Sequence, residues 1–213
     1  NYSIVVSTAH VEQVADYSTL PARPSDPNSA AFGPRGQAWV SDSGDNRLMI
    51  LDVCEEDIRT VGPTGFGHLC GISYGPDAML YGIDSLSESL VQLDQSTGAG
   101  TVVGPLGRGV GNCGLTLDCL TGTMYGVDGG SGELFVIDHL TGAAGPAVNF
   151  ALSSMPSVGL EFDPADSTLL MTNGPILYRM DPGTGALSTI GAFDLGSGFN
   201  DLAFHLGPMP CDL

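Results

Sequence analysis

The segment Met79–Asp94, MLYGIDSLSESLVQLD, is repeated in pattern by Thr123–Asp138, TMYGVDGGSGELFVID. Each copy is an apolar run that ends in an acidic residue, a polar turn, and a second apolar run that ends in another acidic residue. Gln37–Asp52 and Thr168–Asp181 follow the same pattern. The first runs end at Asp42, Asp84, Asp128 and Asn173, which are 42, 44 and 45 positions apart. A nearly constant period of this size indicates a repeat architecture.

Each repeat contains two further strand-sized runs. An apolar stretch precedes the quoted segment, and a valine or isoleucine followed by glycine comes after most copies of it. The preceding stretches are Ala30–Phe32, Gly71–Tyr74, Gly114–Leu117 and Gly159–Phe162, and the later steps are Val61-Gly62, Val103-Gly104 and Ile190-Gly191. Four short strands per repeat of about 43 residues predict the blade of a β-propeller, so we expect an all-β protein.

The repeat resembles the blades of the NHL and YVTN-like β-propeller families, and Trp39–Asp52, WVSDSGDNRLMILD, is the segment most similar to them. The resemblance extends over nearly the whole chain and implies a propeller of four-stranded blades. These families include scaffolds, lectins and hydrolases, so the resemblance implies no particular activity.

The two ends of the chain decide the expected number of blades. Asn200–Phe204 repeats the first strand of a unit, whereas Ser3–Ser7 and Val11–Ala15 look like second and third strands that lack a first. Joined, they would form a closing blade shared between the N- and C-termini, which removes free sheet edges. The sequence therefore predicts one domain over residues 1–213 with five blades. Their approximate bounds are 28–65, 66–108, 109–154, 155–196, and 197–213 together with 1–27.

The charge balance excludes several classes of function. The chain has 24 acidic and 6 basic residues, a net charge of −18, and every basic residue is an arginine. Such a field repels nucleic acid, and no apolar run is long enough to insert across a membrane. The lack of lysine rules out a Walker lysine or a Schiff-base lysine. An acidic surface keeps an extracellular protein soluble and suits cations or a cationic partner.

Five cysteines occur without the spacing of a zinc site, so we expect disulfides and a secreted or cell-surface location. Cys70 and Cys113 immediately precede equivalent glycines in neighbouring blades, which suggests a bridge between them. Cys54, in a hairpin of the first blade, and Cys211, in the C-terminal tail, form the other expected pair. Cys119 is then left as a free thiol, because it lies about 20 Å from Cys113 at the opposite end of one strand.

Asp42, Asp84 and Asp128 admit two interpretations. Equivalent carboxylates around one axis could converge on a cation such as calcium, the one cofactor that the sequence suggests. Alternatively each opens a hairpin by accepting hydrogen bonds from nearby backbone, as aspartates do in Asx turns, and we favour this interpretation. The turn interpretation is stronger still for the carboxylates that open the next hairpin, which are Asp52, Asp94, Asp138 and Asp181.

The loops that join one blade to the next lie on the face where many propellers bind ligands. In this chain they are rich in glycine and present aromatic and polar groups, a combination that suits a sugar or a peptide. The candidate binding residues are Phe66, His68, Arg108, Asn112, Phe199, Asn200 and Asp201. In the alternative interpretation, Phe66 and Phe199 fill gaps between neighbouring blades.

No assembled catalytic motif accompanies these loops. Gly109–Gly114 matches G-x-G-x-x-G, but it leads into a strand and not a helix, and the chain lacks H-E-x-x-H and G-x-S-x-G segments. We therefore expect a non-catalytic binding or assembly module whose partner is a glycan, a protein or another copy of the chain. The alternatives are a calcium-dependent propeller hydrolase or lactonase that uses Asp42, Asp84 and Asp128, and a structural subunit of a larger extracellular assembly.

Overall fold

A computed structural model of the chain describes residues 2–5, 10–13, 23–33, 37–52, 57–152 and 155–193. Within these ranges the regular elements are all β-strands, β1 to β18, which confirms the all-β fold. None of the described segments forms a helix that is long and apolar enough to cross a bilayer.

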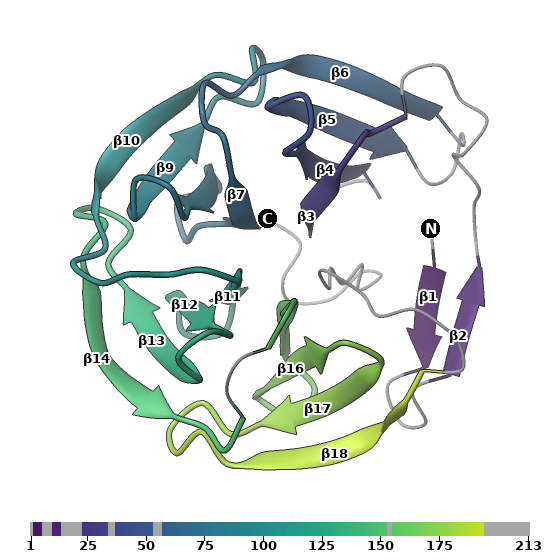
Figure 1. The fold of residues 1–213 in the computed structure, drawn as a ribbon, viewed down its shortest axis with the longest axis vertical. Coiled ribbons are helices and arrows are strands. Elements are labelled where there is room, and N and C mark those ends of the chain that lie inside the picture. The colour runs from purple at the N-terminus through teal and green to yellow at the C-terminus, as the bar shows by residue number, and fades with distance from the viewer. Residues whose placement is uncertain are drawn as a thin grey trace.

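The strands group into four antiparallel, four-stranded sheets arranged around a ring, which is the architecture of a β-propeller (Figure 1). Each sheet is a meander whose first strand is innermost and whose fourth strand lies at the outer edge. Runs of Val, Ile, Leu and Tyr favour the strands, and Asp, Ser, Thr and Gly favour the turns between them. Blade 1 contains β3 (Pro27–Phe32), β4 (Gln37–Asp42), β5 (Arg47–Asp52) and β6 (Asp57–Pro63); blade 2 contains β7 (Leu69–Tyr74), β8 (Leu80–Asp84), β9 (Ser89–Leu93) and β10 (Gly100–Pro105); blade 3 contains β11 (Cys113–Asp118), β12 (Thr123–Asp128), β13 (Glu133–Ile137) and β14 (Ala144–Asn149); blade 4 contains β15 (Leu160–Asp163), β16 (Thr168–Asn173), β17 (Ile176–Met180) and β18 (Leu187–Ala192).

The number of complete blades differs from the expectation. The described residues form four four-stranded blades and not five, with one further two-stranded sheet made of β1 (Tyr2–Val5) and β2 (His10–Gln13). These two strands pair as a hairpin, and Figure 1 places them between blade 4 and blade 1. The strand expected at Asn200–Phe204 lies outside the described residues. The repeat period predicted five blades because it assigned the residues at both ends of the chain to a complete four-stranded sheet. The described part of residues 1–26 supplies two strands.

The inner strands of neighbouring blades pack directly against one another through a column of small residues. The strand register aligns Ser29, Gly71 and Gly114, and Gly159 stands at the same position in blade 4. A Cβ atom on Gly71 would lie 2.7 Å from the backbone nitrogen of Leu115, so a larger residue would push the inner strands of blades 2 and 3 apart. The column begins at Ser29 and not at Ala30, one residue earlier than the sequence alignment placed it.

The outer strands meet the next blade through backbone contacts. The Val61-Gly62 and Val103-Gly104 steps lie in β6 and β10, where a Cβ on either glycine would collide with the carbonyl oxygen of Thr97 or Thr141 in the following blade. Hydrogen bonds also cross these boundaries, from Gly100 N to Thr64 O at 2.8 Å and from Ala144 N to Leu106 O at 3.0 Å. The recurring glycine therefore permits close approach between blades.

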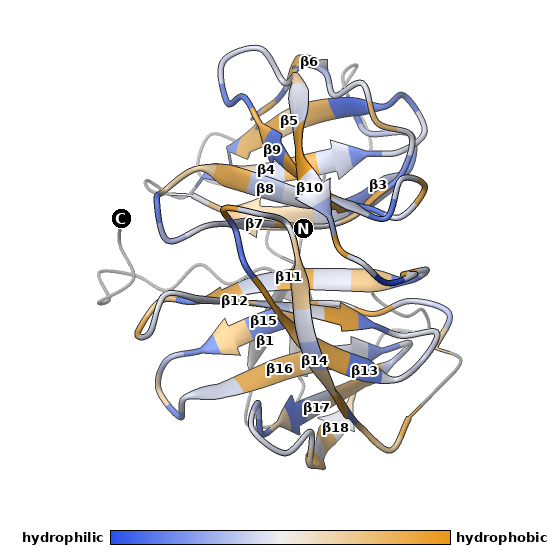
Figure 2. Ribbon diagram, turned by 90° about the vertical axis from the view of Figure 1, so that its left-hand side faces the viewer, coloured by the Kyte–Doolittle hydropathy of each residue, from blue (hydrophilic) through white to orange (hydrophobic). Residues whose placement is uncertain are grey.

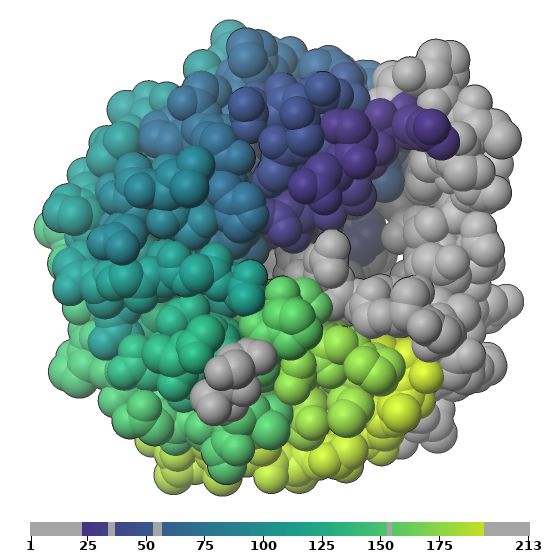
Figure 3. All heavy atoms as spheres, viewed as in Figure 1, coloured from purple at the N-terminus to yellow at the C-terminus, as the bar shows by residue number. Residues whose placement is uncertain are grey.

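Apolar side chains fill the spaces between the blades, which follow one another around the ring in Figure 3. Figure 2 shows that much of the hydrophobic sequence lies on the strands. Trp39 and Tyr81, which occupy equivalent strand positions, are 6% and 3% exposed and belong to these clusters. The indole nitrogen of Trp39 donates a hydrogen bond to the Tyr74 hydroxyl of blade 2 at 2.7 Å. These aromatic residues therefore pack between blades.

Candidate functional site

A pocket of about 210 Å³ lies where the loops that enter the inner strands converge. All four blades contribute to it, and the lining residues that the structure describes include no carboxylate and no arginine. They are Asn28, His68, Cys70, Asn112, Cys113, Pro156, Ser157 and Val158. We call this the channel-mouth pocket. It brings together His68 and Asn112, two of the residues that the sequence singled out as binding candidates.

Half of the lining comes from one position of the repeat. In each blade, the residue just before the small residue of the inner column lines the pocket. These residues are Asn28, Cys70, Cys113 and Val158. Sequence reasoning found Cys70 and Cys113 at this position but missed Asn28 and Val158, along with Pro156 and Ser157. Aligning the repeats on Ser29 would have revealed Asn28, but β3 contains an irregular register between Pro27 and Ser29 that hides this alignment. Val158 precedes the aligned Gly159 and could have been found from the repeat itself.

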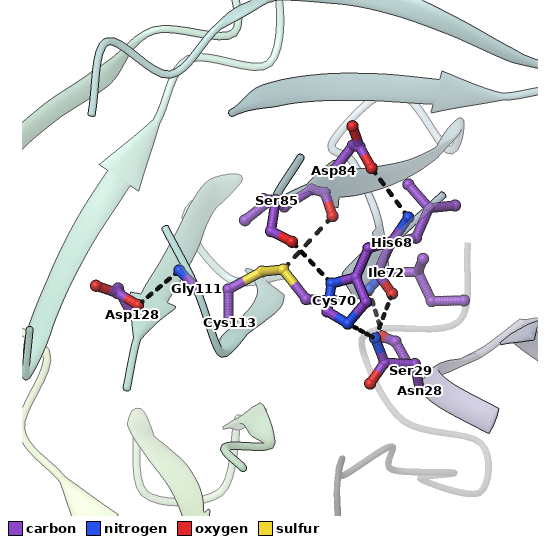
Figure 4. Close-up of a disulfide and its surroundings, with 12 residues drawn as sticks. Asn28, Ser29, His68, Cys70, Ile72, Asp84, Ser85, Gly111, Cys113 and Asp128 are labelled. Atoms are coloured by element: carbon purple, nitrogen blue, oxygen red, sulfur yellow. Dashed lines mark hydrogen bonds between the residues drawn. A yellow bond between two sulfur atoms is a disulfide. The ribbon is translucent and has the colours of Figure 1, made fainter. Parts of the chain in front are cut away.

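A disulfide between Cys70 and Cys113 forms part of the pocket wall, as expected from the sequence (Figure 4). The two Cα atoms are 5.2 Å apart, and the bond joins β7 of blade 2 to β11 of blade 3. This link holds the entrances of two blades at a constant separation.

Cys119 corrects the expected cysteine pairing. It is disulfide-bonded, not a free thiol. Its partner lies outside the described residues, as do Cys54 and Cys211. The expected Cys54–Cys211 bridge therefore falls outside the part of the chain that the structure describes.

His68 is half-buried at the pocket wall and held from both ring nitrogens. Its Nδ1 lies 2.7 Å from the Ser85 hydroxyl oxygen, and its Nε2 lies 3.2 Å from the amide nitrogen of Asn28 (Figure 4). An amide nitrogen only donates, so Nε2 accepts and Nδ1 carries the proton that it donates to Ser85. This arrangement assigns the donor role to Nδ1 and the acceptor role to Nε2, and it fixes the orientation of the ring.

The two asparagines of the pocket tie neighbouring loops together. Asn28 Nδ2 also donates to the Leu69 carbonyl oxygen at 3.3 Å, which joins blade 1 to blade 2. Asn112 Nδ2 donates to the Met155 carbonyl oxygen at 2.8 Å, which joins the loops entering blades 3 and 4. The polar residues of the pocket are therefore positioned before any ligand arrives.

Asp42, Asp84 and Asp128, here called the upper aspartates, end the second strand of blades 1 to 3. They are 1%, 2% and 5% exposed. In each blade, one carboxylate oxygen accepts a hydrogen bond from the loop that enters the first strand: from Asp26 N at 2.8 Å, from His68 N at 3.2 Å and from Gly111 N at 3.1 Å. The carboxylates thus hold the loops that build the pocket.

The other carboxylate oxygen of each upper aspartate accepts hydrogen bonds from residues of its own blade. Ser131 donates to Asp128 Oδ2 from both its nitrogen and its hydroxyl, and Ser87 N donates to Asp84 Oδ2 at 2.9 Å. Asp42 Oδ2 pairs with Arg47 Nε at 3.0 Å. Burial alone raises the pKa of Asp42, but the backbone donors at Asp26 and Ser25 and the Arg47 guanidinium together lower it below its ordinary value.

The structure does not bring the upper aspartates together as a metal centre. Among the described residues, no three side chains of the types that ligate metals lie close enough to share an ion. The hydrogen bonds around each carboxylate are those expected if the residue shapes its hairpin and entry loop.

Two other binding candidates lie away from the pocket. Phe66 packs into the cluster between blades 1 and 2 and lies against Gly100, which agrees with the gap-filling interpretation. The Arg108 guanidinium stacks over the Phe135 ring, 4.5 Å from its centroid, and lies 3.7 Å from Glu133 Oε2. Phe199, Asn200 and Asp201 lie outside the described residues.

Asp94, Asp138 and Asp181, here called the lower aspartates, open the turns between the third and fourth strands. Each accepts hydrogen bonds from residues two and three positions later, as in an Asx turn. Donors at Ser96 and Thr97 lower the pKa of Asp94 to about 2. The pKa of Asp138 and that of Asp181 are also lowered, by Leu140 N with Thr141 and by Thr184 respectively.

Comparison with known proteins supports the fold. No protein-family model matches the sequence, and no curated protein matches it. The structure is similar to a protein of unknown function from Bacteroides thetaiotaomicron, with a TM-score of 0.60, 19% identity, and coverage of 84% of this chain and 46% of that one. It is also similar to an inactive virginiamycin B lyase variant from Staphylococcus aureus, with a TM-score of 0.58, 13% identity and coverage of 80% and 57%.

A nidogen/laminin complex contains a third similar chain, with a TM-score of 0.58, 16% identity, and coverage of 80% of this chain and 69% of that one. The protein described here covers only about half the length of the Bacteroides protein and of the lyase variant. Similarity at such low identity establishes the propeller fold and no particular activity.

Proposed function

We propose that this protein is a secreted or cell-surface binding module that takes a small polar ligand of the carbohydrate class at the channel-mouth pocket, without a catalytic step. The observation that carries the proposal is the convergence of polar side chains from successive blades on one pocket. Asn28, His68 and Asn112 all line it, and each is fixed by hydrogen bonds to a neighbouring loop. Preformed sites of this kind bind ligands at a small entropic cost.

The size and lining of the pocket suit a single sugar ring. Sites for drug-sized ligands measure about 300–1,000 Å³, so a volume of about 210 Å³ fits a smaller group. The amide oxygens of Asn28 and Asn112 offer acceptors to a ligand rich in hydroxyl groups. A side chain of a partner protein has a similar size. If the module serves in assembly, the channel-mouth pocket would bind such a side chain instead of a sugar.

Two features favour binding over hydrolysis. Both ring nitrogens of His68 already form hydrogen bonds, one with Ser85 and one with Asn28. Neither nitrogen is therefore left to accept a proton from a substrate, as a general base must. The carboxylates of Asp42, Asp84 and Asp128, on which a calcium-dependent hydrolase would rely, each bind in their own blade.

The disulfides favour an extracellular location, because such bonds persist in oxidising compartments. Cys70–Cys113 and the bond of Cys119 are the two observations behind this part of the proposal.

A glycan array followed by calorimetric titration tests the proposed function. We expect binding to a defined set of sugars and a loss of affinity of at least about tenfold in Asn112→Ala, since one or two hydrogen bonds are worth that much. Asn149→Ala is the matched control, because Asn149 is exposed on the outer strand β14. An array without binding, together with a native mass spectrum that shows only monomer, contradicts the proposal.

A further inference from the structure

We infer that the channel-mouth pocket selects a ligand that presents a positively charged hydrogen-bond donor, such as the ammonium group of an amino sugar. This inference rests on the proposed function and deepens it, since it states which member of the carbohydrate class the site prefers. Three features of the described residues carry it: the orientation of the two amides, the state of His68, and the carboxylates behind the pocket wall.

Asn28 offers the pocket an acceptor. Both hydrogens of its amide nitrogen are used, one toward His68 Nε2 at 3.2 Å and one toward the Leu69 carbonyl oxygen at 3.3 Å. Its Oδ1 accepts no hydrogen bond from another described residue, and Figure 4 shows this oxygen pointing away from His68. A ligand atom that approaches Asn28 therefore meets a carbonyl oxygen, which accepts and cannot donate.

Asn112 repeats this arrangement on the far side of the disulfide. Its amide nitrogen donates to the Met155 carbonyl oxygen at 2.8 Å. Within the described part of the chain, its Oδ1 is likewise without a donor, and the side chain as a whole is exposed. Asn28 thus turns both amide hydrogens toward the protein and Asn112 turns one of its two, and both side chains leave an acceptor oxygen for a ligand.

His68 adds no donor on the pocket side. Its proton is on Nδ1 and is donated to Ser85, and its Nε2 accepts from Asn28. An anionic ligand would therefore meet the amide oxygen of Asn28 and an imidazole nitrogen that already accepts a hydrogen bond. Among the described residues that line the pocket there is no arginine, the side chain that commonly recognises carboxylates.

Negative charge lies directly behind this wall. Asp84 Oδ1 accepts from the backbone nitrogen of His68, and Asp128 Oδ1 accepts from that of Gly111, which precedes Asn112. Together with a net charge of −18, these carboxylates give the pocket a potential that attracts cations and repels anions.

A matched series of three sugars tests the inference by calorimetry at pH 7, where most amines carry a proton and an imidazole of ordinary pKa does not. The probes are glucosamine, glucose and glucuronate, which have the same ring and differ in charge. We expect glucosamine to bind at least about tenfold more tightly than glucose, since a charge-assisted hydrogen bond is roughly twice as strong as a neutral one. We expect no binding of glucuronate.

The outcomes separate this inference from the proposed function. Equal affinity for glucose and glucosamine, or binding of glucuronate, overturns the selection for a cationic donor while sugar binding itself stands. Failure of all three sugars to bind, with an empty glycan array, overturns both.

A pair of variants with the same change in charge provides a second readout. Asn112→Asp keeps an acceptor oxygen at the pocket and adds a negative charge, so we expect glucosamine to bind about tenfold more tightly and glucose to change less than about threefold. Asn149→Asp adds the same charge on outer strand β14 and should leave both affinities unchanged. An equal gain in the two variants, or no gain in Asn112→Asp with an unaltered thermal midpoint, contradicts the inference.

Discussion

The upper and lower aspartates are the same residue type at the ends of strands, but they act over different distances. Asp42 and Asp84 bond to backbone nitrogens 16 positions away, whereas Asp94 and Asp181 bond to residues two and three positions away. The upper carboxylates are nearly fully buried, and the lower ones are exposed. The upper set therefore shapes tertiary structure around the pocket, and the lower set shapes individual turns.

This difference has a physical cause. A buried carboxylate that is removed leaves several donors without a partner, whereas water replaces an exposed one. The lower turns nevertheless matter for the ring, because the Thr97–Gly98 and Thr141–Gly142 turns pack against Gly62 and Gly104 of the preceding blade. Four sets of variants test this difference between the two ends of the blades.

The largest effect is expected from the Cys70–Cys113 disulfide, which lies in the wall of the channel-mouth pocket. The bond closes a segment with a sequence separation of 43 residues, for which the chain-entropy argument gives a stabilisation of about 4 kcal/mol. We expect the double variant Cys70→Ser, Cys113→Ser to lose about this much free energy of unfolding in urea titrations. A loss below about 1 kcal/mol would show that the upper hydrogen bonds alone hold the pocket loops.

The second effect comes from Asp128, the upper aspartate of blade 3. Asp128 accepts four hydrogen bonds, from the nitrogens of Gly111, Gly130 and Ser131 and from the Ser131 hydroxyl, so Asp128→Ala removes the acceptor of four partly buried bonds. We expect a loss of about 3 kcal/mol in the free energy of unfolding, together with weaker ligand binding. Asp94→Ala is the matched lower-face variant and should cost clearly less and leave binding unchanged. Equal losses would remove the distinction between the two sets.

The third effect is a dependence of stability on pH at a lower aspartate. The pKa of Asp94 is about 2 in the folded protein and ordinarily 3.8, so its charged form stabilises the fold above pH 3.8. This contribution disappears as the pH falls through 2. We expect Asp94→Asn to have a lower thermal midpoint than the parent protein at pH 7 and the same midpoint near pH 2. A constant difference across this range would contradict the assignment of the shift to hydrogen bonds of the turn.

The smallest effect concerns an aspartate of a lower turn that acts on a neighbouring side chain. Burial, then the hydrogen bond and charge of Asp77, raise the pKa of Tyr81 to about 12, and the hydroxyl of Tyr81 lies 2.8 Å from Asp77 Oδ2. Asp77→Asn should lower the pKa of Tyr81 while leaving it above 10, because burial remains. Ultraviolet titration of tyrosine ionisation measures the change, and an unchanged value would assign the whole shift to burial.

Much of the fold was predictable because its signals are local. Alternating apolar runs and turn residues predict the strands, and the constant period predicts blades. The same period placed Cys70 and Cys113 at one position of neighbouring blades, which predicted their bridge. The number of blades was not predictable in this way, because the terminal segments show a strand-like pattern whether or not they complete a sheet.

The pocket was only half predictable. His68 and Asn112 were found because polar residues in entry loops are recognisable, whereas Arg108, which was grouped with them, lies away from this pocket. Its guanidinium stacks on Phe135, a residue of β13 that lies 27 positions later in the chain. Asn28 was missed because the irregular register of β3 shifts the alignment by one residue.

The sequence by itself determined the strands, the turns and the order of the blades, since the interactions that form them join residues close together in the chain. Only the tertiary structure decided which loop residues face the channel mouth, which carboxylates are buried and where each asparagine turns its amide. These properties depend on the packing of four inner strands whose residues are separated by about forty positions, so no single stretch of sequence contains them.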